Sequence, residues 1–182
     1  MLPVLKEVFL RFVTTPVASQ LTGLSTDKLR EWTSRRALVP ADVRPQGKGS
    51  PAKFGWQTIL VLRLAVLLRD SFGLELAAHK SAFAELRTDL RNRSFLGLWG
   101  CRLALSPAGT WVFLETEGTL PSGDFLIVEL DPHLCILRDR FALPDAAAAA
   151  GQLDLFSLPN LQGRKRTQVG RQTSVAADRK TA

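Results

Sequence analysis

Two helix-start signals separated by one glycine are the feature of this sequence that most constrains its fold. A threonine pair precedes Pro16, and proline is favoured in the first turn of a helix when a hydroxyl residue caps it. Beyond Gly23, Ser25 is the capping residue of a second helix-start signal. The spacing therefore predicts two short helices, over residues 17–21 and 28–36, joined as a helix-turn-helix.

The residues that follow extend this helical unit. An apolar-proline stop at residues 38–40 ends the second helix, and Lys48 lies between glycines that predict a hairpin tip. Residues 56–70 are almost entirely apolar and predict a buried helix. Another helix is predicted from about residue 72 to Arg91. Trp32 and Trp56 fall on these helices, where we expect them to be core residues rather than platforms for nucleic-acid bases.

This order of elements resembles the winged-helix DNA-binding domain of the MerR family, in which a Leu-Arg-aromatic motif precedes a basic wing. Leu29 and Arg30 match the motif, and Glu31 stands where the family usually has an aromatic residue. The resemblance covers residues 16–91 and implies that the second helix enters the major groove of duplex DNA. The implied DNA contacts are Thr26, Lys28, Arg30, Arg35, Arg36, Lys48 and Lys53. The alternative is a helical scaffold whose basic face is solvated or binds protein.

The apolar pattern changes period after Trp99. Residues 103–105 and 111–114 flank a Pro-Ala-Gly turn and predict one hairpin, and residues 125–130 and 134–137 predict a second around an Asp-Pro turn. Four short strands would form a small antiparallel β-meander that must pack on the helices to be stable. We expect a structural or protein-binding sheet.

A pentapeptide near the carboxyl end is the clearest functional motif. Gln152, Leu153, Asp154, Leu155 and Phe156 lie between an alanine run and a basic tail. All five resemble the peptide by which bacterial replication proteins bind the sliding clamp, the beta subunit of DNA polymerase III. Leu155 and Phe156 are the expected anchors, each contributing about 1.5–3 kcal/mol when fully buried, and the Gln152 amide can set the register. The alternative is a short amphipathic segment that packs on its own domain.

The two resemblances together predict a protein that occupies the clamp. Such a protein either recruits another factor to replicating DNA or blocks the polymerase and stops replication elongation, and we expect the block. This outcome resembles that of a clamp-targeting toxin from a toxin–antitoxin pair, which implies an antitoxin or a protease adaptor as a further partner. The competing interpretation is a MerR-type transcription regulator in which the pentapeptide is incidental.

Charge and cysteine usage limit the functional classes to which a protein with this sequence can belong. Residues 1–56 carry nine Lys or Arg against four Asp or Glu, and residues 160–182 carry six against one, which favours contact with a polyanion or an acidic protein face. Two cysteines without a CxxC pair and two histidines predict neither a zinc site nor a disulfide framework. With no phosphate loop or nucleophile elbow, we expect a cytoplasmic binding protein without cofactor, enzymatic activity or membrane association.

The predicted fold class is therefore α+β. Residues 1–15 are expected to be an extension and residues 16–95 the MerR-like winged helix-turn-helix. Residues 96–143 would form the small β module. Residues 144–182 would form a linker, the clamp motif at 152–156 and a disordered basic tail.

Overall fold

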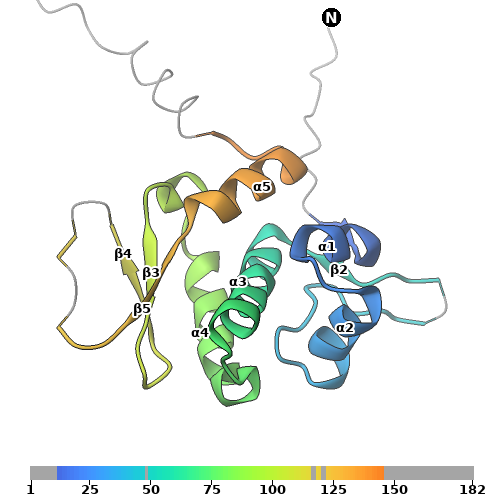
Figure 1. Cartoon of the computed structure of the whole chain (residues 1–182). Coiled ribbons are helices and arrows are strands. Elements are labelled where there is room, and N and C mark those ends of the chain that lie inside the picture. Colours follow the sequence, from blue (N-terminus) through green and yellow to red (C-terminus); the bar gives the residue numbers. More distant parts are fainter. Residues whose placement is uncertain (1–11, 48, 116–117, 120–121, 146–182) are drawn as a thin grey trace, which may run out of the picture.

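The structure is a computed structural model that describes residues 12–47, 49–115, 118–119 and 122–145 (Figure 1). This part of the chain combines helices with two small antiparallel sheets, one of two strands and one of three. The α+β class predicted from the sequence is confirmed. Among the described helices, none is long and apolar enough to cross a membrane.

Both predicted helix starts are present. Helix α1, Thr15–Thr22, has proline in its first turn and ends at Gly23, whose φ of 74° lies in the left-handed region that favours glycine. Helix α2, Thr26–Arg30, begins at Ser25, whose hydroxyl accepts a hydrogen bond from the Lys28 backbone N–H at 3.2 Å. The chain then continues as a π-helical turn, η1, at Glu31–Arg35.

A loop and a two-stranded sheet follow this helix pair. Strand β2, Lys53–Phe54, pairs antiparallel with β1, Val13–Thr14, and an isolated bridge joins Val43 to Lys53. The pairing holds the end of the loop beside the start of α1, although 39 positions separate Thr14 from Lys53. The predicted hairpin tip falls in this loop, and Lys48 itself lies outside the described residues.

Helix α3, Trp56–Phe72, is the centre of the fold. It lies between α1 and the following helix α4, Lys80–Arg91, in Figure 1. A short 3-10 turn, η2, at Leu76–His79 leads into α4. Residues Ile59 to Leu62 are all fully buried, because α3 is apolar around most of its circumference and packs against α1, α4 and α5.

The first predicted hairpin is also confirmed. A short 3-10 turn, η3, at Leu96–Leu98 leads into β3, Arg102–Leu105, which pairs antiparallel with β4, Trp111–Leu114. Strand β5, Leu126–Glu129, pairs with the other edge of β3. The sheet order is β4-β3-β5, so the central strand is the first of the three in sequence.

The second predicted hairpin is wrong, and with it the four-stranded meander. Residues 134–137 belong to helix α5, Asp131–Phe141, which has proline in its first turn. Leu134, Leu137 and Phe141 are buried at helical spacing, and α5 packs on α3. An apolar run of four residues fits a strand or a buried helix equally well, and only the longer spacing to Phe141 distinguishes them.

One hydrophobic core joins the helices to the sheet. Buried side chains from Val13 to Phe141 belong to the same cluster. Trp32 is 3% exposed, and the Trp56 ring packs edge-to-face on Phe95 with centroids 5.2 Å apart. Trp32 is therefore a core residue, as the sequence predicted, and Trp56 is partly buried and packs against the core.

Candidate nucleic-acid interface

A groove of about 530 Å³ runs between the second helix and the loop before β2. Thr15 and Pro16 at the start of α1 line one part of it, and Arg30 and Arg35 line the α2–η1 side. Loop residues 50–52 form the opposite wall. The β1–β2 pairing creates this groove, because it brings the loop back beside α1 and α2.

Several residues predicted to contact DNA lie on or beside this groove. Arg30 and Arg35 are exposed, and Arg30 makes a long, exposed ion pair with Asp27 at 3.5 Å. Such pairs contribute little to stability, so Arg30 can exchange partners at small cost. Lys53 is exposed on β2, between two residues that line the groove. Thr26 is half-buried in the first turn of α2 and does not line the groove.

Lys28 and Arg36 do not line this groove. Both pair with Glu31, with Lys28 Nζ at 3.0 Å from one carboxylate oxygen and Arg36 Nε at 2.7 Å from the other. The hydrogen bond from Lys28 and the nearby arginines hold the pKa of Glu31 below its usual range. Lys28 and Arg36 line the same cavity as Trp32, whereas Arg30 lines the groove. Lys28 and Arg36 therefore lie on a different side of the second helix from Arg30.

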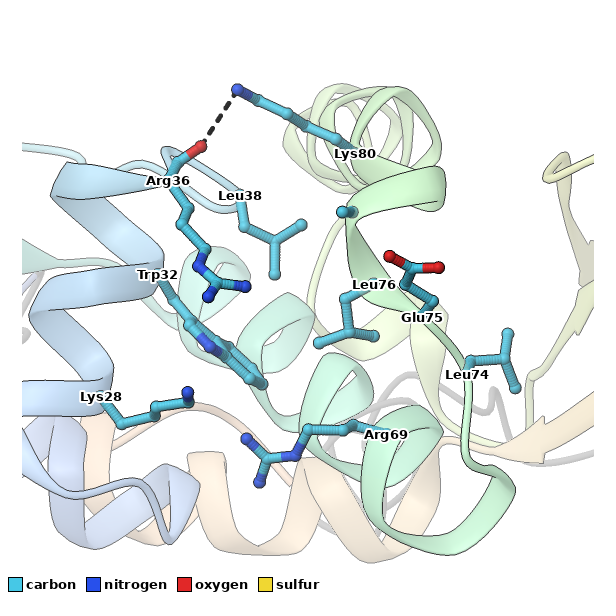
Figure 2. Close-up of a pocket in the computed structure, with 10 residues that line it drawn as sticks. Lys28, Trp32, Arg36, Leu38, Arg69, Leu74, Glu75, Leu76 and Lys80 are labelled. Atoms are coloured by element: carbon cyan, nitrogen blue, oxygen red, sulfur yellow. Dashed lines mark hydrogen bonds between the residues drawn. The ribbon is translucent and has the colours of Figure 1, made fainter.

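These two cations line a second cavity, of about 460 Å³, on the opposite side of the second helix (Figure 2). Arg69 from α3 and Lys80 from α4 also border it. The Arg69 guanidinium lies 4.8 Å from the centroid of the Trp32 ring, and Lys80 Nζ donates to the Arg36 carbonyl at 3.1 Å. Sequence reasoning did not identify Arg69 or Lys80, because only the packing of α3 and α4 brings them to this cavity.

Asp42 is a further residue that the sequence did not single out. One carboxylate oxygen accepts from the Gly55 backbone N–H at 2.7 Å, and the other from Arg87 of α4 at 2.6 Å. Burial acts to raise the pKa of Asp42, but the hydrogen bonds from Gly55 and Arg87 outweigh it and hold the pKa below its ordinary value. Asp42 thus ties the loop to the start of α3 and to α4, which fixes one wall of the groove.

The clamp motif at residues 152–156 and the basic tail lie outside the described residues. Cys101 and Cys135 are free thiols. Across the part of the chain that the structure describes, no group of three or more His, Cys, Asp or Glu side chains could hold a metal ion.

No model of a known protein family matches this sequence. No curated protein matches it either. Functional assignment therefore depends on the groove, the cavity and the sequence motifs themselves.

Proposed function

We propose that this protein binds the bacterial sliding clamp through Gln152–Phe156 and competes there with replication proteins. The observation that carries the proposal is the match of all five residues to the clamp-binding peptide. Six residues separate Asp145, the last described residue, from Gln152. Extended chain spans at most about 3.3–3.6 Å per residue, so the motif is tethered within roughly 25 Å of the folded part.

Occupation of the clamp by this chain would act as a block to replication. Each clamp subunit offers one peptide groove, which polymerases and other clamp ligands share. A competing peptide attached to a folded domain would exclude these ligands from the groove it fills and would hold a bulky domain beside it. The chain would then be a toxin of replication elongation, with an antitoxin or a protease adaptor as its regulator.

Primer extension by a clamp-dependent polymerase tests this function directly. We expect the full chain to reduce the length of the products, and we expect excess clamp to restore it. The variant Gln152→Ala should inhibit much less, because the amide that sets the register is lost. Gln162→Ala is the matched control and should inhibit like the unmodified chain. Inhibition that persists in Gln152→Ala, or that excess clamp does not relieve, would contradict the proposal.

The groove supports a second function, binding of duplex DNA by a winged helix-turn-helix of the MerR type. Arg30 and Arg35 stand on the second helix, and Lys53 stands on the strand that follows the loop. A helix flanked by a basic hairpin is the arrangement that such domains use to place the helix in the major groove and the wing on phosphates.

An electrophoretic mobility shift assay on duplex DNA tests the groove. We expect Arg30→Ala combined with Arg35→Ala to weaken binding by about tenfold or more and to reduce the salt dependence by about two charges, because each arginine neutralises a phosphate. Lys28→Ala combined with Arg36→Ala should have a smaller effect, because Glu31 already pairs with both cations. Arg140→Ala, an exposed arginine on α5, is the control. Equal losses in all three variants would rule out the groove as the DNA site.

A further inference from the structure

The cavity beside Trp32 combines an apolar wall with a cluster of cations at one end. Leu38, Leu74 and Leu76 supply aliphatic surface. In Figure 2 the Lys28 ammonium and the guanidiniums of Arg36 and Arg69 lie around the Trp32 ring, across from Leu76. A volume of about 460 Å³ is within the range of small-molecule sites.

The cations at this end are only partly neutralised. Arg36 uses its Nε for the pair with Glu31, which leaves its terminal N–H groups to face a ligand. Arg69 bonds the neighbouring Asp70 through Nε and Nη2 and keeps its Nη1 donors. Lys80 adds a fourth positive charge at the rim. Against these four cations stand the carboxylates of Glu31, Asp70 and Glu75, so the cavity has a net positive charge.

The Trp32 ring is not a free stacking surface. It is 3% exposed, and the Arg69 guanidinium covers it at 4.8 Å. A ligand would therefore place its charged group beside Arg36 and Arg69, and its apolar body against the leucines. A purely apolar ligand would leave the cations without a new partner, and a small inorganic anion would make no apolar contact with the leucine wall.

The geometry points to this cavity as a binding site for a small amphipathic anion, a molecule with one carboxylate, sulfonate or phosphate group on an apolar body. The walls come from the second helix, the end of α3 and the turn η2. A bound anion bridges these three elements and stabilises their packing, because it binds the folded chain only. The inference depends on neither DNA binding nor clamp binding.

Titration with anilinonaphthalene sulfonate, a fluorescent amphipathic anion, tests the site on the full chain. We expect saturable binding at one site, with displacement by octanoate but not by octanol, because the neutral alcohol has no charge for Arg36 and Arg69. The far-ultraviolet circular dichroism of each protein is recorded alongside, so that binding to unfolded chains is recognised. Absence of saturable binding, or equal displacement by octanol, would overturn the inference.

Matched variants locate the site. Arg69→Gln should weaken binding by about tenfold, because the anion loses a charge-assisted hydrogen bond. The control is Arg93→Gln, because Arg93 also stacks on an aromatic ring, with its guanidinium 4.0 Å from the centroid of Phe113, but lies outside the cavity. Two variants at the rim of the cavity, with opposite expected effects on affinity, complete the test if Arg69→Gln fails to fold. Lys80→Gln should weaken binding and Glu75→Gln should strengthen it by several-fold, and equal affinities in both would overturn the assignment.

Discussion

The chain with Leu155→Ala and Phe156→Ala is expected to lose measurable binding to the bacterial sliding clamp. The two side chains are the apolar anchors of the motif, and burial of each contributes about 1.5–3 kcal/mol. Their joint loss corresponds to about a hundredfold or more in the dissociation constant. A peptide motif of this length binds in the micromolar range, so a loss of that size removes the complex from a pull-down.

A control in the same part of the chain shows whether clamp binding depends on the motif itself or on any apolar side chains nearby. Leu158 and Leu161 follow the motif closely, and Leu158→Ala combined with Leu161→Ala removes a similar apolar area. This variant should bind the clamp like the unmodified chain in surface plasmon resonance. If both double variants bind equally well, Gln152–Phe156 is not the docking peptide.

Mild acid is expected to destabilise the fold through His133. Burial is the larger cause and the charge of Arg63 the smaller, and together they lower the pKa of His133 to about 4. Arg63 Nε donates to His133 Nδ1 at 3.3 Å, and an Arg63 Nη donor also bonds the Leu21 carbonyl. The Nδ1 atom is therefore an acceptor, and the neutral ring carries its proton on Nε2.

The direction of the pH effect follows from the difference between the pKa of His133 in the folded and in the unfolded chain. The unfolded His133 has an ordinary pKa near 6.5, so between about pH 6.5 and 4 the unfolded chain binds a proton that the folded chain does not. Stability therefore falls as the pH is lowered through this window. We expect the free energy of unfolding to decrease by about 2 kcal/mol from about pH 7 to about pH 5, measured by urea denaturation.

Two variants assign this loss to one histidine. His133→Gln keeps an acceptor for Arg63 without a group that titrates in this range, so its stability should change far less between the two pH values. His79→Gln alters the other histidine of the chain and should retain the full decrease. An unchanged pH dependence in His133→Gln would show that other groups cause the loss.

Local signals predicted the helical part of the fold well. Ser25 and Pro16 act within one turn of chain, and the apolar run at 56–70 is buried on nearly every side. The error at residues 134–137 arose because a short apolar run fits the repeat of a β-strand and that of an α-helix equally well. The pairing of β5 with β3 could not be predicted, because it depends on which strand edge the connecting residues allow β5 to reach.

The grouping of the candidate DNA-contact residues was predicted less completely than the fold. Sequence reasoning placed seven DNA contacts on the second helix and the wing, but it could not tell which cations share a face or which carboxylate neutralises them. Glu31 was noticed as a departure from the family pattern, and the structure shows that it pairs with Lys28 and Arg36. The clamp motif remains a prediction from sequence.

The sequence by itself determined the helix starts, the buried character of α3, the first hairpin and the five residues of the proposed clamp peptide, because each depends on neighbouring residues alone. Only the tertiary structure decided that α5 is a helix packed on α3, that Asp42 fixes the loop, and that Arg69 and Lys80 join Arg36 around one cavity. These features depend on contacts between residues far apart in the chain, and folding brings such residues together only when the whole core is formed.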